Sequence, residues 1–376
     1  MKNFFPVKGK KREEILDKIN QARDEDLNFS SGKVLGSMCT EPLEMSKRTH
    51  SMFLEANLGN PGLCRGTKKL ENEIHSAVSS LIHAEDHEAL SVGGATEGNI
   101  LALWRAREKS GKSKVLLPES AHFSFVKACS LLDMEPIYIP LTERYTLDTE
   151  ILEDELDEET AAVVGIAGTT EHGVIDPIEE MAEIAGDIYL HVDAAFGGFV
   201  IPFLKELGDD LPKFDFEIED VDSLVLDPHK MGLSTVPLGL FYSKDKNNIS
   251  IKSPYLTSGK QKTIRGTRSS ASVPAFWTAM NLLGKEGYKE IVAECMENTH
   301  YTVNKMKEVG LEPVIEPVMN IASFHFDEPE RVVKEVNGMG WNISLTVNPS
   351  GLRFVIMPHV KKESIDEMAE ILEDII

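Results

Sequence analysis

The chain has 376 residues, 41% of them hydrophobic and 27% charged, so it can bury a sizeable core without disulfides or structural metal. Its 62 acidic and 39 basic residues give a formal charge of −23, and such a surface repels nucleic acid and anionic lipid. The four cysteines form no CxxC pair, and no apolar run suits a membrane span or a signal peptide, so we expect a reduced, cytoplasmic location.

The first predicted element is an amphipathic helix over residues 11–25, with Ile15, Leu16 and Ile19 on one face. Residues 30–66 are rich in Gly, Pro and Asn, which predicts loops around short elements. From about residue 67, helical patterns separate short apolar segments, an alternation that favours a parallel or mixed α/β sheet. The strand candidates are Glu88–Val92, Lys114–Leu117, Pro136–Ile139, Ala161–Ile166, Ile188–Val192 and Ser223–Leu226.

The pattern changes after about residue 270 and predicts a smaller α+β domain. We expect helices over Val273–Leu283, Lys289–Val309 and residues 329–338, and a last helix from Lys362. Strands are expected near 313–326 and over Leu352–Met357. The predicted division is an N-terminal segment 1–60, a large domain 61–270 and a small domain 271–376.

Polar residues follow several of the predicted strands, where open α/β sheets bind ligands. The loop Gly93–Asn99 leads into a helix, and its glycines would offer backbone N–H groups and the positive helix end to a phosphate. The hydroxyl of Thr96 could add a further contact. The spacing is not GxGxxG, no P-loop motif occurs, and a plain strand–helix turn is the competing interpretation.

Asp193 and Lys230 stand at the ends of two apolar strands, 37 residues apart. A buried carboxylate is costly unless paired, so Asp193 is either a structural cap or the partner of a pyridine nitrogen. Lys230, in Asp227-Pro228-His229-Lys230, is either solvated or a partly buried amine suited to imine formation. Alternatively, His191, Asp193, Asp227 and His229 have HxD and DxH spacings that would suit a metal-dependent hydrolase.

Three further features have both a functional and a plain interpretation. The hydroxyls of Thr169 and Thr170 could steady a ring substituent or belong to a turn, and His122 could stack on a flat cofactor ring or be structural. A basic cluster interrupts the acidic composition and indicates a local anionic partner or a solvated loop. It consists of Lys260, Lys262, Arg265 and Arg268.

Taken together, these residues resemble the group II PLP-dependent decarboxylases of fold type I, and most of all the archaeal L-tyrosine/L-aspartate decarboxylases. The resemblance covers about residues 35–359. The shared stretches are Leu35–Cys39, Asn57–Gly62, Ala121–Phe125, Ala167–Thr170, His191–Gly198, Asp227–Gly232 and Arg353–His359. It implies a large, mostly parallel seven-stranded sheet domain, a smaller C-terminal α+β domain, and a homodimer with active sites near the subunit interface.

The same resemblance implies roles for individual residues. Lys230 would bind pyridoxal 5'-phosphate (PLP) covalently, Asp193 would pair with the ring nitrogen and His122 would stack on the ring. The remaining predicted contacts are Gly94, Ala95, Thr96, Thr170, Asp227 and His229 for the cofactor, Asn60 and Arg353 for the substrate, and Thr267, within Gly259–Ser270, for the neighbouring subunit's phosphate. Relatives usually read Ser-Gly-Gly-Thr-Glu-Ala-Asn at the phosphate loop, and the changes here could shift phosphate affinity.

The implied activity is decarboxylation of L-aspartate to β-alanine, for coenzyme A, or of L-tyrosine to tyramine, for methanofuran. A glutamate decarboxylase, an aminotransferase or a carbon–carbon lyase of the same fold remains an alternative. The sequence contains no conspicuous catalytic cysteine loop, which weighs against a cysteine desulfurase. A non-catalytic PLP-binding protein is a further alternative, disfavoured by retention of the whole set of residues.

Overall fold

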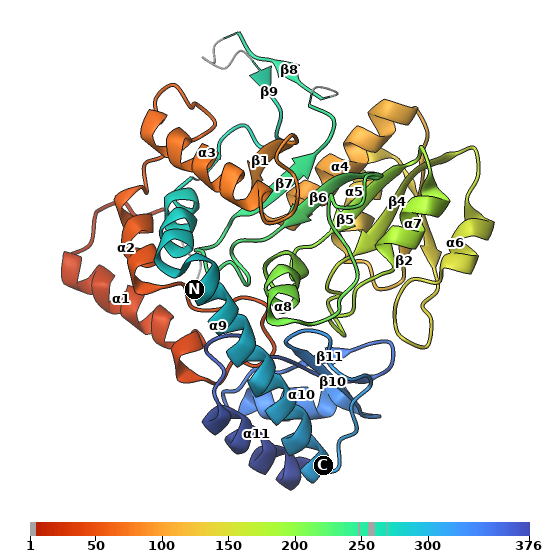
Figure 1. Cartoon of the computed structure of the whole chain (residues 1–376). Coiled ribbons are helices and arrows are strands. Elements are labelled where there is room, and N and C mark those ends of the chain that lie inside the picture. The colour runs from red at the N-terminus through yellow and green to blue at the C-terminus, as the bar shows by residue number, and fades with distance from the viewer. Residues whose placement is uncertain (1–4, 247–248, 255–259, 269) are drawn as a thin grey trace.

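A seven-stranded sheet organises the larger part of the molecule, and a smaller sheet lies beside it near the C-terminus (Figure 1). This computed structural model describes residues 5–246, 249–254, 260–268 and 270–376. The large sheet has the order β1-β7-β6-β5-β4-β2-β3. Its strands are β1 (Glu88–Val92), β2 (Lys114–Pro118), β3 (Glu135–Ile139), β4 (Thr160–Ile166), β5 (Tyr189–Asp193), β6 (Val221–Leu226) and β7 (Gly239–Ser243).

The six predicted strands are confirmed, within one or two residues at their ends, and the predicted mixed, mostly parallel sheet is confirmed too. β7 was not among the individually predicted strands. It runs antiparallel to both of its neighbours, β1 and β6, while the other neighbouring pairs are parallel. Since β1, β4, β5 and β6 all run the same way, the residues after their carboxyl ends meet at one edge of the sheet.

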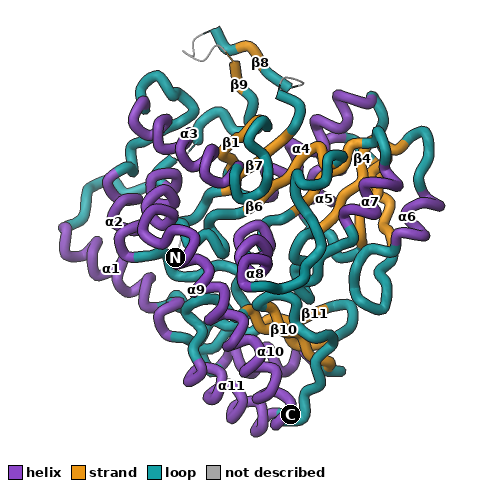
Figure 2. Tube along the Cα trace, in the orientation of Figure 1, coloured by secondary structure: helices purple, strands orange, loops and turns teal. Residues whose placement is uncertain are grey.

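Helices cover both faces of this sheet (Figures 1 and 2). Side chains alternate across a strand, so Ala162 and Val164 of β4 pack with the helices of one face and Val163 with those of the other. The first face carries α4 (Ala95–Ser110) and α5 (Ser124–Leu132). The opposite face carries α3 (Arg65–Ser79), α7 (Ile178–Ala185), α8 (Ile201–Leu207) and the start of α9 (Ser272–Glu308).

Helix α9 joins the two parts of the molecule. It covers both predicted helices, 273–283 and 289–309, and Gly284, whose φ is 57°, interrupts the helical backbone between them. Its first half packs against α2 (Glu44–Met52), α3 and α8, and its second half against α11 (Lys362–Ile375). The helix begins one residue after the predicted domain boundary at 271.

The small domain has a three-stranded antiparallel sheet in the order β10-β12-β11. Its strands are β10 (Ile321–His325), β11 (Ser344–Thr346) and β12 (Gly351–Val355), and α10 (Pro329–Gly338) and α11 pack beside them. The N-terminal segment completes this domain: the Leu35 N–H donates to the Asn342 carbonyl at 2.7 Å, and the Val355 N–H donates to the Leu35 carbonyl at 2.6 Å. Leu35 is fully buried in the small domain's core.

Several remaining elements lie at the periphery of the molecule. The predicted amphipathic helix is present as α1 (Arg12–Asp24), yet none of its residues is buried. The others are η1 (Phe29–Ser31), α6 (Thr149–Glu155), η2 (Gly197–Phe199) and the paired strands β8 (Ile251–Lys252) and β9 (Lys260–Gln261). In the described part of the chain, no helix combines the length and the apolar character needed to span a membrane.

Candidate active site

A pocket of about 320 Å³ lies beyond the carboxyl ends of β1, β4, β5 and β6. It contains the residues that the sequence predicts to hold a cofactor. Those that line it are Gly94, Ala95, Thr96, His122, Thr170, Asp193, Asp227, His229 and Lys230. Met38, from the N-terminal segment, lines it as well. Residues separated by up to 192 positions are therefore brought together at one edge of the sheet.

The phosphate-loop candidate is the turn between β1 and α4. Gly94 has a φ of 114°, a left-handed conformation that favours glycine, and α4 begins at the next residue. The Ala95 and Thr96 positions therefore form the first turn of a 16-residue helix, whose N-terminal dipole faces the pocket. A Cβ at Gly239, the first residue of β7, would lie 2.8 Å from the Gly94 backbone, so this glycine allows β7 to pack closely against the turn.

Asp193 is held in place by two hydrogen bonds at the end of β5. The side-chain amide of Asn99 donates to its Oδ2 at 2.8 Å, and the backbone N–H of Ala195 donates to its Oδ1 at 3.0 Å. Asp193 is 5% exposed and lines the pocket. The carboxylate therefore has a fixed orientation inside a largely dehydrated site, where its charge acts most strongly.

Asn99 connects Asp193 to the two histidines of the site. Its amide also donates to Ser124 Oγ at 2.9 Å, and its carbonyl oxygen accepts from His191 Nε2 at 2.9 Å. With Nε2 donating, His191 Nδ1 accepts from Ser223 Oγ, also at 2.9 Å. Burial lowers the pKa of His191 to about 4, so this ring is neutral near pH 7. Both of its nitrogens are occupied within the network.

His122 stands at the other end of this chain of bonds. The Ser124 N–H donates to its Nδ1 at 3.2 Å, and Ser124 Oγ lies 2.9 Å from the same nitrogen. With Nδ1 accepting, the neutral ring carries its proton on Nε2. Burial is the main cause that lowers the pKa of His122, and the nearby Lys230 acts in the same direction while Asp193 opposes it. A neutral ring is favoured near pH 7.

Lys230 follows β6 in a tight turn, in which its N–H donates to the Asp227 carbonyl at 3.0 Å. Its Nζ lies 3.6 Å from Asp227 Oδ2, and His229 Nε2 lies 3.7 Å from the same oxygen. Burial raises the pKa of Asp227, and the charges of Lys230 and His229 oppose that shift. Among the described residues, Asp227 Oδ1 and the buried Ser120 Oγ have no hydrogen-bond partner.

Three predicted site residues do not line the pocket. Arg353 of β12 is mostly buried, and its guanidinium donates to Ser344 Oγ at 2.8 Å, the Thr170 carbonyl at 2.5 Å and the Gly36 carbonyl at 3.2 Å. It thus ties the small domain to two loops around the pocket. Asn60 lies in a turn whose neighbour, Gly59, packs against the Gly266 carbonyl. Thr267 is exposed.

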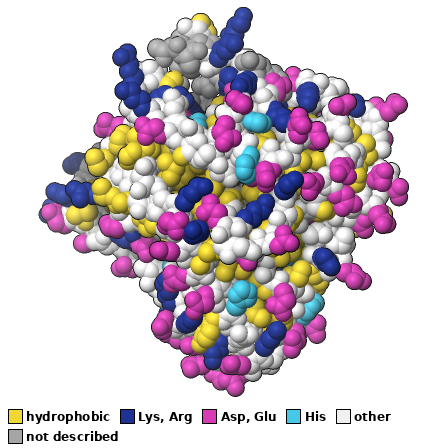
Figure 3. Space-filling view, in the orientation of Figure 1, with side chains coloured by type: hydrophobic (Ala, Val, Ile, Leu, Met, Phe, Trp, Pro, Cys, Tyr) yellow, Lys and Arg dark blue, Asp and Glu magenta, His cyan; other side chains and the backbone are white. Residues whose placement is uncertain are grey.

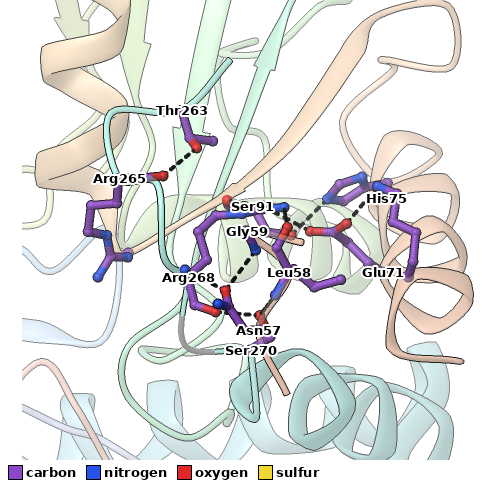
Figure 4. A network of polar contacts seen from close by, with 12 residues as sticks. Asn57, Leu58, Gly59, Glu71, His75, Ser91, Thr263, Arg265, Arg268 and Ser270 are labelled. Atoms are coloured by element: carbon purple, nitrogen blue, oxygen red, sulfur yellow. Dashed lines mark hydrogen bonds and ion pairs between the residues drawn. The ribbon is translucent and has the colours of Figure 1, made fainter. Parts of the chain in front are cut away.

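The basic cluster is engaged by its own subunit. Lys262 pairs with Glu88, Arg265 with Glu97 at 2.9 Å and Arg268 with Glu71 at 3.2 Å. Arg268 also donates to the carbonyls of Ser91 and Leu58, as Figure 4 shows. Within the predicted segment Gly259–Ser270, Gly259 and Ser269 fall outside the described residues.

The hydrolase alternative finds no support in this geometry. His191, Asp193, Asp227 and His229 do not converge as a set of metal ligands within the described ranges. There, one group has side chains close enough to hold a metal ion, and it consists of His83, Asp215 and Glu217, outside the pocket. Both ring nitrogens of His191 are already engaged by Ser223 and Asn99.

Sequence reasoning missed Asn99 and Ser124 as parts of the site. Asn99 stands one helical turn after Thr96 on α4, and Ser124 stands two residues after His122, so both are adjacent to predicted residues. That adjacency is the available signal in the sequence. It does not reveal that Asn99 reaches Asp193, because this contact depends on how α4 packs over β5.

Comparison with known proteins identifies relatives along the whole chain. Residues 93–326 match the model of the pyridoxal-dependent decarboxylase conserved domain. A probable L-tyrosine/L-aspartate decarboxylase of Methanosphaera stadtmanae is 43% identical over 98% of both chains, and an L-aspartate/L-glutamate decarboxylase of Pyrococcus horikoshii is 42% identical over 99% of both. The solved structure of a Burkholderia pseudomallei sphingosine-1-phosphate lyase superposes with a TM-score of 0.89 at 25% identity, covering 100% of this chain and 92% of the lyase.

Proposed function

Since this chain belongs to the pyridoxal-dependent decarboxylase family, we propose that it decarboxylates L-aspartate and, as a second substrate, L-tyrosine. The observation that carries the chemistry is the meeting of Lys230, Asp193 and the Gly94–Thr96 turn in one pocket. The expected family, fold, cofactor and enzyme class are confirmed by the comparisons.

The pocket contains groups suited to both ends of the PLP molecule. Lys230 supplies an amine for the aldehyde, Asp193 supplies a fixed carboxylate for the pyridine nitrogen, and the N-terminus of α4 suits the phosphate. The buried Ser120 Oγ and Asp227 Oδ1 have no hydrogen-bond partner among the described residues, as expected of groups that await a polar ligand. These orphaned atoms are independent of the family assignment.

When bound, PLP supplies an electron-withdrawing ring that accepts the electron pair left by the departing carboxylate. The chain's own residues make that ring effective. Asp193, held by Asn99 and the Ala195 N–H, would keep a proton on the ring nitrogen. The neutral ring of His122 would pack on the cofactor, and its position is set by the Ser124 N–H. Buried walls around these groups exclude water, so the charges are weakly screened.

The substrate proposal rests on the relatives and on a neighbouring pocket. L-aspartate is the substrate that the names of the Methanosphaera and Pyrococcus relatives have in common. A second pocket of about 320 Å³ shares Ser120, His122, Phe123 and Thr170 with the first, and Leu141 and Val347 also line it. An aromatic side chain such as that of L-tyrosine suits these apolar walls. The products would be β-alanine and tyramine, which links the enzyme to coenzyme A or methanofuran biosynthesis.

Arg353, Asn60 and Thr267 belong to the proposal as outer contacts. To grip a substrate carboxylate, Arg353 would exchange one of the carbonyl groups that it now binds, of which Thr170 is at the pocket. Thr267 is exposed next to Arg268, where a neighbouring subunit could approach it. Asn60 would act from the turn that contacts Gly266.

The deciding experiment supplies the PLP-loaded enzyme separately with L-aspartate, L-tyrosine and L-glutamate and measures carbon dioxide and the amine product. We expect the largest kcat/KM for L-aspartate, measurable turnover of L-tyrosine, and none in a Lys230→Ala control. A visible cofactor band without carbon dioxide would instead indicate an aminotransferase or a carbon–carbon lyase. Preference for L-glutamate would overturn the substrate assignment alone.

A homodimer is proposed from the surface that carries α1 to α3. The apolar face of α1 is exposed, and hydrophobic side chains gather over α2, α3 and the loop between them (Figure 3). In that region Met52 is 72%, Leu54 68% and Leu63 82% exposed. Contiguous apolar surface of this kind typically marks a protein interface. Sedimentation equilibrium should give twice the chain mass of 41.7 kDa, and a monomer would contradict the proposal.

A further inference from the structure

Arg265 does not itself line the pocket, but it lies against Gly93, which does, and the proposed roles leave it unassigned. It belongs to residues 260–268, here called the strap, which begin with strand β9. Its Nε donates to Glu97 Oε2 at 2.9 Å and its backbone N–H donates to Glu97 Oε1 at 3.2 Å. Glu97 Oε2 also accepts from the Gly93 N–H at 2.7 Å, so one carboxylate joins the strap to the first residue of the phosphate turn.

The guanidinium lies directly against Gly93. A Cβ built on this glycine would be 1.6 Å from Nη2, 2.2 Å from Cζ and 2.8 Å from Nη1. The φ of Gly93 is not positive, so the backbone itself does not require glycine there. Instead, the arginine head fills the volume that any side chain would need. Gly93 lines the pocket, and this contact places a cation beside its phosphate end.

The bonding of Arg265 leaves its outer edge suited to an anion. Glu97, which is 8% exposed, engages Nε, while the two terminal nitrogens face Gly93. Those nitrogens form the fork with which arginine binds phosphate in pairs of charge-assisted hydrogen bonds. Two other cations of the strap are engaged elsewhere: Lys262 bonds Glu88 and Arg268 reaches Glu71. Figure 4 shows Arg265 and Arg268 directed away from each other.

We propose that Arg265 binds the phosphate of the PLP held in its own subunit, and that Glu97 is the residue that positions Arg265. Gly93 is the matching feature on the opposite side, because its missing side chain makes room for the guanidinium. The inference rests on PLP being the cofactor. It does not depend on which amino acid is decarboxylated.

The test compares PLP with pyridoxal, which lacks the phosphate. The full-length chain is freed of cofactor by dialysis and titrated with each compound, and binding is followed by the visible absorbance band. Arg265→Gln should raise the dissociation constant for PLP about tenfold, the usual effect of losing one charge-assisted contact, and leave that for pyridoxal unchanged. Lys262→Gln is the matched control and should change neither constant.

A second variant tests the same contact from the other side. Gly93→Ala should displace the guanidinium and weaken PLP binding to the extent that Arg265→Gln does, and the double variant should show no additional loss. An unchanged ratio of the PLP and pyridoxal constants in Arg265→Gln would overturn the proposal. So would equal weakening of both compounds, which would assign Arg265 a purely structural role. Neither outcome depends on turnover, so the proposed substrate is tested separately.

Discussion

The floor of the pocket and the strap are both polar, but they are held in different ways. At the floor, Asp193, Asn99 and His191 are almost fully buried and joined by hydrogen bonds of 2.8–2.9 Å. In the strap, Arg265 keeps 44% of its side chain exposed. The strap is attached to the body of the molecule by ion pairs and by the hydrogen bonds of Arg268 to the Ser91 and Leu58 carbonyls. The floor is therefore fixed by a buried, satisfied network, whereas the strap includes one largely exposed cation, Arg265, whose ion pair salt can screen.

This difference implies separate roles for the floor and the strap. In the proposed function the floor residues would orient the groups that act on the cofactor ring, whereas the strap would place Arg265 near the phosphate. Substitutions in the floor should mainly lower turnover, and substitutions of strap anchors should mainly lower stability or cofactor affinity. Each of the following changes tests this division.

The largest effect is expected for Asp193→Asn. The variant keeps the shape of the side chain but removes the charge opposite the ring nitrogen, so turnover should fall roughly 10²- to 10³-fold. PLP should still bind, because Lys230 and the phosphate turn are untouched. Steady-state kinetics together with the visible spectrum measure both quantities. Near-normal kcat with bound PLP would refute the role given to the floor.

Glu71→Gln should destabilise the protein by about 3 kcal/mol, since it leaves the guanidinium of Arg268 partly buried without its charge partner. Burial favours a raised pKa for Glu71, but Arg268, His75 and Lys68 together outweigh it and hold the pKa below its ordinary value. The folded state therefore favours the charged form at neutral pH. Urea unfolding measures the loss, and turnover per PLP-loaded molecule should change little. An equal loss of turnover would contradict the proposed division between floor and strap.

Acid should destabilise the protein through two buried histidines: His75 of α3, which lies near Glu71, and His191 of the floor. Burial lowers the pKa of His75 and of His191 to about 4. Below pH 6.5 the unfolded chain takes up protons that these folded rings refuse, so the unfolding free energy falls as pH decreases towards 4, by roughly 3 kcal/mol per histidine. Unfolding curves from pH 7 to 4 measure this loss, which His75→Gln should reduce by the roughly 3 kcal/mol that one histidine contributes. A loss unaffected by this variant would contradict the neutral state of His75.

The smallest effect is expected for Asn99→Ala. Asp193 would lose one of its two hydrogen bonds and His191 Nε2 its acceptor, at a cost of about 1–3 kcal/mol in stability. Turnover should fall about tenfold, because Asp193 keeps its charge and its bond to Ala195 but loses part of its orientation. Thermal unfolding and kcat provide the two readings. If kcat drops as far as in Asp193→Asn, Asn99 contributes more than orientation.

Most of the fold could be predicted from local sequence patterns. The apolar segments after residue 87 predict six strands of the large sheet, because fully buried parallel strands appear as short continuous apolar runs. The strand β7 and its antiparallel direction depend on packing between β1 and β6, which the pattern does not encode. The periodicity of residues 11–25 correctly predicts a helix, but it also suggests a buried face that this chain leaves exposed.

The site was predictable where its residues act from strand ends, as Asp193, Asp227 and Lys230 do. It was not predictable where a contact joins distant elements. Asn99 reaches Asp193 across 94 positions, and Arg265 meets Glu97 across 168. Arg353 illustrates the opposite case: its planar fork suggests a substrate carboxylate, but the structure gives it backbone carbonyls of Thr170 and Gly36.

The bonds of Leu35 to Asn342 and Val355 have a consequence for biosynthesis. The ribosome makes Leu35 early, but its partners emerge more than three hundred residues later. The small domain's core therefore cannot close during translation until nearly the whole chain has left the exit tunnel. Met38, three residues beyond Leu35, lines the pocket, so one wall of the catalytic chamber is also assembled last. A nascent chain should therefore lack this wall of the pocket until the residues around 355 have emerged.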